Sequence, residues 1–167
     1  AARGTADIVV YGSRRILERV AAKTGLPFPV VEISGDDFPE ADAVVPGKVQ
    51  ACCGRMANRW FRAAAADALA GKIAAVVTAP LNKESLHASG ETLPGHTEIL
   101  AEVCGNAAEP CMLFWSPEMV LGLVTIHTSL QSVPGLLTVD GVLQKLRLTH
   151  QTAQRIYGGP VTVGLLG

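Results

Sequence analysis

Short apolar runs alternate with helical patterns at the start of the chain, and this alternation most constrains its fold. Residues 7–11 are typical of a short buried strand, and residues 14–23 place apolar side chains on one helical face. Ser13 is a natural N-cap for that helix and Gly25 supplies its end. A second strand is expected near residues 29–33. The pattern predicts an alternating α/β protein.

The middle of the chain continues this alternation. Residues 35–46 are rich in Asp, Pro and Gly and indicate a loop, and the Ala-dominated residues 51–70 predict a long helix that ends at Gly71. The larger side chains of this helix are its expected core anchors: Met56, Trp60 and Leu69. The compact β-branched run 73–77 is typical of a strand buried on both faces of a parallel sheet.

The remaining elements follow from the same signals. Residues 98–103 predict a helix, and residues 111–115 and 120–126 predict strands joined as a hairpin. Thr138 caps a predicted helix through Tyr157, and residues 161–166 begin another strand. The sequence shows no repeat or linker that would assign an internal domain boundary.

Composition excludes several classes of protein. The 167 residues fit one ordinary domain, and 49% hydrophobic with 17% charged residues excludes a disordered chain and leaves apolar surface for a partner. A net charge of −1 with scattered basic residues argues against nucleic-acid binding. No apolar run approaches the ~20 residues of a membrane-spanning helix. We therefore expect a soluble, cytoplasmic protein that uses neither nucleic acid nor a membrane.

The four cysteines form no CxxC pair and have no histidine at zinc-finger spacing. We expect them to act as small buried hydrophobic residues. A nucleophilic role for Cys53 has no support in the sequence.

A candidate anion site begins at Gly95, where a helix is expected to open. The unpaired N–H groups and positive dipole end of a helix N-terminus suit phosphate or carboxylate. His96 and the Thr97 hydroxyl add side-chain donors. On local sequence alone, the favoured alternative is that Thr97 only caps the helix and His96 is a half-exposed loop residue.

Lys83 and His127 are two further candidates. Lys83 follows the exit of the predicted strand 73–77, where an ammonium can pair with a substrate anion or, with a lowered pKa, transfer protons; a solvated surface lysine is the usual case. His127 follows the predicted strand 120–126, in a partly desolvated position that suits a metal ligand. One histidine cannot hold a catalytic metal, so His127 taken alone is more often structural.

Three ordered motifs extend the argument by resemblance. Residues 77–84 (VTAPLNKE), 94–98 (PGHTE) and 125–130 (TIHTSL) together resemble the 4-hydroxythreonine-4-phosphate dehydrogenase family in order and spacing. The resemblance covers nearly the whole chain and includes the helix start at 136–138. It implies an α/β fold like that of isocitrate and isopropylmalate dehydrogenases, with layered α/β/α architecture.

The resemblance also implies roles for individual residues. His96 and Thr97 are expected to contact a phosphorylated substrate, and His127 is expected to bind a divalent metal such as Zn, Mg or Co. The family's GDPAGIGPE-like start and its two other histidine-bearing segments, NPHAGE-like and YHDQG-like, are not found in the sequence. Residues 1–167 are therefore expected to be about half of such an enzyme, truncated at both ends, and unable alone to hold the metal tightly or turn over substrate.

The implied reaction uses NAD or NADP to oxidise the secondary alcohol of 4-hydroxythreonine 4-phosphate, and the β-keto acid then loses carbon dioxide. This is a step of pyridoxine biosynthesis. Family members are homodimers with active sites at the subunit interface, which would account for the apolar surface. The cofactor is expected to bind mainly through downstream residues.

Other readings stay open. Paralogues of this family oxidise D-threonate or D-erythronate 4-phosphate, and others act on aromatic-acid dihydrodiols; the 79–83 sequence APLNK is compatible with such a paralogue. A phosphate acyltransferase-like enzyme shares a related fold and needs no histidine-bound metal. A non-catalytic ligand-binding domain would keep the anion site and leave His127 structural.

Overall fold

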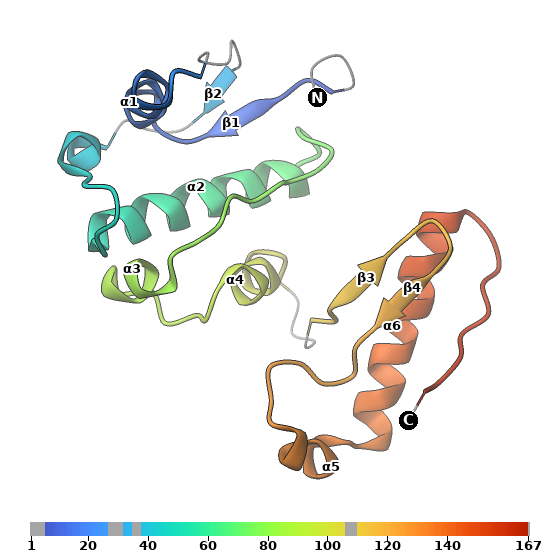
Figure 1. Ribbon diagram of the computed structural model, residues 1–167. Coiled ribbons are helices and arrows are strands. Elements are labelled where there is room, and N and C mark those ends of the chain that lie inside the picture. The colour runs from blue at the N-terminus through green and yellow to red at the C-terminus, as the bar shows by residue number, and fades with distance from the viewer. Residues whose placement is uncertain (1–5, 27–31, 35–37, 106–109, 167) are drawn as a thin grey trace. The chain divides into compact units, whose positions relative to one another are not determined.

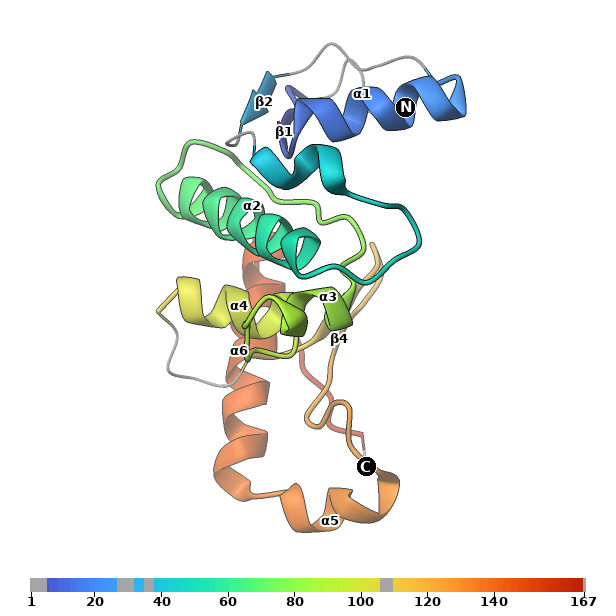
Figure 2. The same cartoon turned by 90° about the vertical axis from the view of Figure 1, so that its left-hand side faces the viewer.

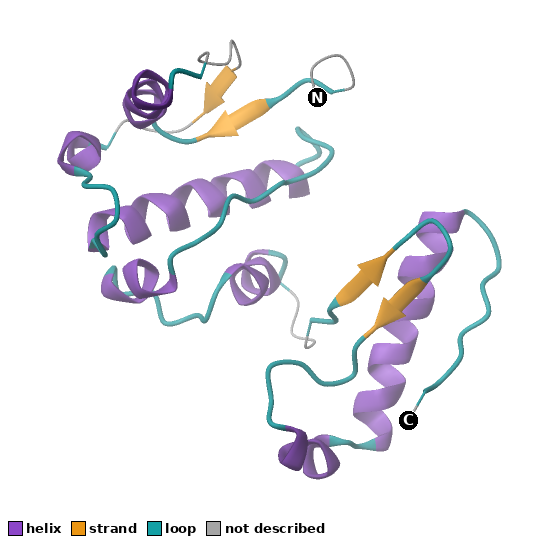
Figure 3. Cartoon of the chain, in the orientation of Figure 1, coloured by secondary structure: helices purple, strands orange, loops and turns teal. Residues whose placement is uncertain are grey.

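The computed structural model describes residues 6–26, 32–34, 38–105 and 110–166. It consists of two compact units, Ala1–Ala108 and Glu109–Gly167, each with its own packing. Both units combine helices with short strands (Figures 1 and 3). The predicted mixture of helix and strand is therefore confirmed.

The first unit opens with a parallel strand pair connected by a helix. Strand β1 (Val9–Tyr11) pairs with β2 (Glu32–Ser34), and α1 (Arg14–Thr24) lies between them in the sequence. The Ser13 hydroxyl accepts a hydrogen bond from the N–H of Ile16 at 3.5 Å, and Gly25 ends α1 at φ 69°. Both helix signals in the sequence are thus confirmed. Of the strand predicted near 29–33, residues 29–31 lie outside the described residues.

A short 3-10 helix interrupts the predicted loop 35–46. This helix, η1 (Pro39–Ala43), begins with Pro39, whose fixed φ favours a first helical turn. Arg15 of α1 pairs with Asp42 at 2.7 Å, and Arg19 donates to the carbonyl of Val44 at 2.8 Å. These cations at the carboxyl end of η1 hold it against α1.

The long helix α2 (Ala51–Leu69) occupies the middle of the first unit, as predicted. In both Figure 1 and Figure 2, the β1–α1–β2 part lies on one side of α2, and the two helices that follow α2 within the first unit lie on the other. Met56 is 2% exposed and Trp60 is half-buried, as core anchors should be. Leu69 is 59% exposed, so its predicted core role was wrong: it is the last residue of α2, where the helix passes beyond its packing partners.

Two short helices cover the other side of α2. They are α3 (Lys83–Ala88) and α4 (His96–Val103). Their buried side chains Leu86 and Ile99 meet Phe61 of α2 in one hydrophobic cluster. Burial of such side chains contributes about 1.5–3 kcal/mol each, so this cluster fixes the positions of both helices on α2.

A glycine sets the closest approach of α3 to α2. A Cβ built on Gly54 would overlap the backbone carbonyl of Ser85. The side chain of Ser85 in turn accepts a hydrogen bond from the N–H of Gln50 at 3.2 Å. Glycine is therefore required at this crossing because the neighbouring atoms are backbone and cannot move aside.

The segment 73–77 forms no strand, contrary to the prediction. Val77 is 96% exposed, and no described segment pairs with these residues. Val76 packs against the cluster of Phe61, Leu86 and Ile99, but a strand also needs hydrogen-bonded neighbours, and the described part of the chain provides none for 73–77.

The loop that leads into α4 is tied to α2 through Glu91. One carboxylate oxygen of Glu91 accepts hydrogen bonds from the N–H groups of Thr92 at 2.9 Å and Leu93 at 3.1 Å. The other oxygen accepts from Asn58 at 2.7 Å and Arg62 at 3.0 Å, both on α2. The loop 91–95 is thus held to α2 by a half-buried ionic network.

The second unit is a hairpin packed on a long helix. Strands β3 (Leu113–Trp115) and β4 (Val120–Gly122) are antiparallel, as predicted, and join through a turn in which Ser116 and Met119 exchange backbone hydrogen bonds. A short 3-10 helix, η2 (Leu130–Ser132), and α5 (Val133–Leu136) precede the long helix.

Helix α6 (Val139–Tyr157) confirms the last helix prediction (Figure 3). The Thr138 hydroxyl caps it by accepting from the N–H of Gly141 at 3.1 Å. Gly122 of β4 faces α6 closely, since a Cβ there would overlap the Thr149 side chain. Among the described helices, none combines the length and apolar character needed to cross a bilayer.

Two strand predictions in the second unit were wrong in extent or kind. The predicted strand 120–126 ends at Gly122, where its pairing with Leu113 stops. Residues 161–166 form no strand, and within the described residues no segment pairs with them. β-Branched composition cannot by itself form a strand without a hydrogen-bonded neighbour.

We expect Gly54→Ala to destabilise the first unit by about 2–4 kcal/mol, because its Cβ would overlap the α3 backbone. Gly12→Ala is the matched control, since its Cβ would meet Val10 and Leu17 at ordinary contact distances of 3.7 and 3.9 Å. Urea unfolding of both variants in the full-length protein measures the difference. Equal stability of the two variants would contradict the close packing of α3 on α2.

We expect the protein to lose stability in acid because Glu91 becomes protonated. The N–H of Leu93 and then the guanidinium of Arg62 are the largest causes that lower the pKa of Glu91, to about 2. A depressed pKa in the folded state stabilises the protein above the ordinary value of 4.5 and loses that contribution as pH falls towards 2. The full contribution is at most about 3 kcal/mol.

The measurement is the free energy of unfolding between pH 6 and pH 2 (roughly the range over which this linkage acts). Glu91→Gln should flatten the loss of stability between about pH 4.5 and 2. Glu118→Gln removes a carboxylate from the exposed hairpin turn and controls for the change in net charge. An unchanged acid profile in Glu91→Gln would show that the network contributes no linkage.

Candidate functional site

The amino end of α4 presents unpaired backbone donors. Gly95 is buried and precedes the helix without a side-chain cap, and the first turn closes through a hydrogen bond from Ile99 N–H to the Gly95 carbonyl at 3.1 Å. Among the described residues, no acceptor meets the N–H groups of His96, Thr97 or Glu98. Such a helix end attracts anions through its donors and its dipole.

The ring of His96 lies against the core cluster. Its centroid is 4.6 Å from that of Phe61, with an interplanar angle of 63°. The histidine is half-buried, so its ring packs against the core and stays partly accessible. Thr97, the next residue of α4, is also half-buried. The helix start predicted at 95–97 is confirmed.

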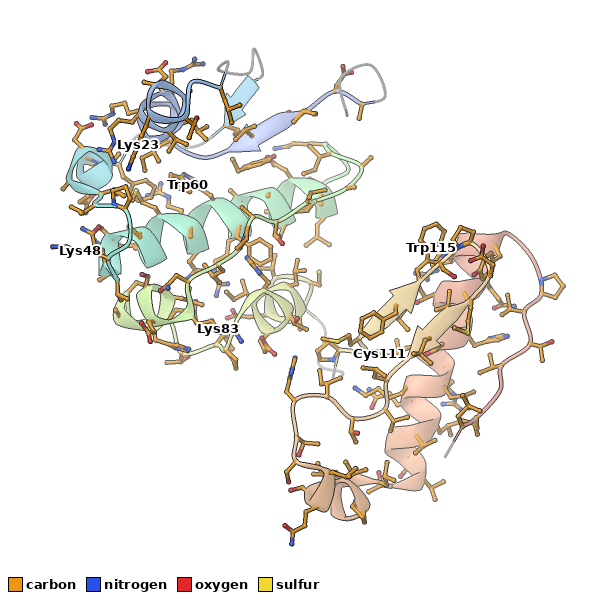
Figure 4. All side chains as sticks on the ribbon, viewed as in Figure 1. Lys23, Lys48, Trp60, Lys83, Cys111 and Trp115 are labelled. Atoms are coloured by element: carbon orange, nitrogen blue, oxygen red, sulfur yellow. The ribbon has the colours of Figure 1, made fainter. Side chains whose placement is uncertain are left out.

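The side chain of Lys83 reaches the amino end of α4 from α3. It is the first residue of α3, which Asn82 caps by accepting a hydrogen bond from the N–H of Ser85 at 2.7 Å. A Cβ built on Gly95 would lie 3.6 Å from the Lys83 Cε, so this side chain extends to the amino end of α4 (Figure 4). The structure thus brings together Lys83, His96 and Thr97, which are three of the four residues that the sequence singled out.

Glu98 adds a negative charge beside these donors. A Cβ built on Gly95 would also lie 3.8 Å from an Oε2 of Glu98. A carboxylate in the first turn of a helix is favoured by the dipole. Lys83 brings a positive charge near the same glycine, so the site combines one cationic side chain, one carboxylate and the backbone donors of α4.

His127 lies in the second unit, on the segment between β4 and η2. Its side chain is exposed rather than partly desolvated, because β4 ends five residues earlier, at Gly122. Its φ of 53° is in the left-handed region, which costs a non-glycine residue about 1 kcal/mol or more. Strained backbone of this kind is concentrated at functional sites.

The described residues do not assemble a metal site around His127. Within them, no group of three or more His, Cys, Asp or Glu side chains is arranged to hold an ion. A catalytic zinc site uses three protein ligands, so His127 does not form such a site with the other described residues.

Sequence reasoning missed three residues that shape the site at α4. Asn82 has a local signal, since an Asn before a helical stretch is a typical N-cap. Glu91 and Phe61 have none, because their partners lie far along the sequence: Asn58 is 33 residues from Glu91. A local sequence pattern does not indicate which distant residues will come into contact.

The other histidines and cysteines have limited roles. His87 is exposed, and its Nδ1 lies 3.0 Å from the carbonyl oxygen of Glu91. His150 is half-buried on α6. All four cysteines are free; Cys104 is exposed and the others are half-buried, so the prediction that they are buried residues was wrong. Burial raises the pKa of the Cys53 thiol, which disfavours its nucleophilic form.

Comparison with curated proteins finds relatives over most of the chain. A 4-hydroxythreonine-4-phosphate dehydrogenase from Trichlorobacter lovleyi is 34% identical, over 89% of this chain and 49% of the relative. A D-threonate 4-phosphate dehydrogenase from Pectobacterium atrosepticum is also 34% identical, over 90% of this chain and 45% of the relative. The chain spans about half the length of the curated relatives it matches.

A solved structure and a family model agree with these relatives. The crystal structure of 4-hydroxythreonine-4-phosphate dehydrogenase from Klebsiella pneumoniae matches with a TM-score of 0.81 and 29% identity, over 95% of this chain and 51% of that chain. The model of the family described as pyridoxal phosphate biosynthetic protein PdxA matches residues 4–163. The resemblance carried by the three sequence motifs is confirmed, and the chain belongs to the PdxA family.

Proposed function

We propose that the protein is an NAD- or NADP-dependent dehydrogenase that oxidises the secondary alcohol of 4-hydroxythreonine 4-phosphate, followed by decarboxylation. The observation that carries this proposal is the meeting of Lys83 with the open amino end of α4, beside His96 and Thr97. The name of the Trichlorobacter lovleyi relative supports the same substrate.

The proposed role of this site is to hold the substrate's phosphate. A phosphate dianion can accept hydrogen bonds from the N–H groups at the start of α4 and from the Thr97 hydroxyl. Lys83 supplies a point charge that offsets Glu98 and pairs with the anion. His96 adds a donor whose ring orientation is fixed by Phe61. Binding the phosphate firmly positions the distant alcohol for reaction.

We also propose a divalent metal (Zn, Mg or Co) with His127 as one of its ligands. Among the described residues, His127 has no complete set of companion ligands. NAD or NADP, when bound, would accept the hydride of the substrate alcohol. We further propose the isocitrate dehydrogenase-like α/β/α layering, a homodimer and a cytoplasmic location; these rest on the family resemblance.

A second candidate substrate is D-threonate 4-phosphate. The Pectobacterium atrosepticum relative carries that name at the same 34% identity. Both candidate substrates present a phosphate, so the site at α4 serves either one. The choice is tested by comparing kcat/KM for the two compounds with NAD and with NADP in the full-length protein. Activity with neither compound would contradict the proposed function.

Replacing Lys83 with Ala is expected to raise KM for the phosphorylated substrate about tenfold, because a charge-assisted hydrogen bond is worth ~1.5–3 kcal/mol and Lys83 is partly solvated. His96→Ala should have an effect in the same direction. Lys23→Ala is the matched control, since Lys23 is an exposed lysine in the last turn of α1 (Figure 4). If Lys83→Ala behaves like Lys23→Ala, the phosphate does not bind beside Lys83.

His127→Ala is expected to lower the affinity of the full-length protein for its divalent metal by about tenfold or more, because a direct ligand is lost. His127→Gly removes the same imidazole and also relieves the positive φ, so it should lose metal without losing stability. His150→Ala on α6 is the control. Metal titration by calorimetry reports the affinity; an unchanged affinity in both His127 variants would show that His127 is not a ligand.

A further inference from the structure

We propose that Glu91 is the positioning residue of the phosphate site, holding the loop that delivers His96 and Thr97 against helix α2. The inference rests on the proposed function, because it assigns to Glu91 the geometry of that same site. Neither the family match nor the sequence motifs single out this residue, which lies before the PGHTE segment at 94–98.

The two carboxylate oxygens of Glu91 accept hydrogen bonds from different groups of donors. Oε1 accepts from the backbone N–H groups of Thr92 and Leu93, which shapes the loop itself. Oε2 accepts from Asn58 and Arg62, which attaches the loop to α2. The side chain is 11% exposed, so these bonds face little competition from water.

The same stretch of α2 also contacts His96 at the site. Phe61, against which the His96 ring packs, is next to Arg62 in the sequence and three residues from Asn58. Residues 58–62 of α2 thus make two contacts: Asn58 and Arg62 bind Glu91 of the loop, and the ring of Phe61 packs against His96. Only four residues separate Glu91 from His96, so a shift of the loop on α2 moves the donors of α4.

Arg62 provides an internal contrast between two carboxylates. It pairs with Glu91 at 3.0 Å and with Glu102 at 2.7 Å. Glu102 is 58% exposed and lies in the last turn of α4, and within the described residues it accepts no hydrogen bond from the loop backbone. Loss of Glu102 removes one ion pair of Arg62, whereas loss of Glu91 removes an ion pair and the loop anchor.

Glutamine cannot replace Glu91 in this arrangement. A glutamine side chain keeps one accepting oxygen and presents an amino group, which donates, at the other position. It can therefore satisfy either the Thr92 and Leu93 N–H groups or the Asn58 and Arg62 donors. Glu91→Gln must release the loop or its attachment to α2, with little change in side-chain volume.

The test compares Glu91→Gln with Glu102→Gln in the full-length protein. Inorganic phosphate is titrated while the imidazole resonances of His96 are followed by NMR, and KM and kcat are measured for the phosphorylated substrate. We expect Glu91→Gln to weaken phosphate binding and raise KM about tenfold, with kcat within twofold and altered His96 shifts. Glu102→Gln should stay within twofold of wild type on every reading.

A merely structural role of Glu91 would lower the melting temperature without changing phosphate affinity or KM of the folded protein, and that result would overturn the inference. Equal effects of the two variants would also overturn it, because Glu91 would then act only through Arg62. If Glu91→Gln does not fold, Glu91→Asp keeps the charge but shortens the reach, and the same shift in KM is expected. Wild-type protein that binds no phosphate at His96 would instead overturn the proposed function, and the inference with it.

Discussion

The hydrophobic contact of Phe61, Leu86 and Ile99 determines the arrangement of the first unit. Each side chain comes from a different helix, and together they join α2, α3 and α4. Because α3 carries Lys83 at its start and α4 carries His96 at its start, one apolar cluster places both residues. The polar site is therefore a consequence of apolar packing, and His96 contacts that packing directly through Phe61.

Charged side chains then complete the site that the hydrophobic cluster positions. Lys83 and Glu98 put opposite charges beside Gly95, and Glu91 fixes the loop before it. The oxygens of Glu91 accept hydrogen bonds from backbone and guanidinium donors. These bonds hold the pKa of Glu91 far below its usual value. Glu91 thus joins the loop before α4 to α2 by hydrogen bonds, which suits a site that must present several donors at once.

Much of this arrangement follows from local sequence signals, and the remainder depends on distant partners. Ser13, Gly25 and Thr138 mark helix ends because capping is local, and all three signals were correct. The wrong strand predictions are those at 73–77 and 161–166 and the length of the strand before His127, since strand formation depends on neighbours that a local pattern does not contain. The anion site at 95–97 was predictable from the helix start, but the contribution of Glu91 was not.

The absence of a side chain at Gly54 has a consequence for how the first unit forms. Glycine within a helix costs about 1 kcal/mol relative to alanine, so this part of α2 is a weak helix by itself. Its order depends on the backbone of α3 lying against it, and α3, with six residues, is too short to persist alone. The two segments are therefore expected to acquire their structure together, as one cooperative folding step, and the approach of Lys83 to α4 arises in that step.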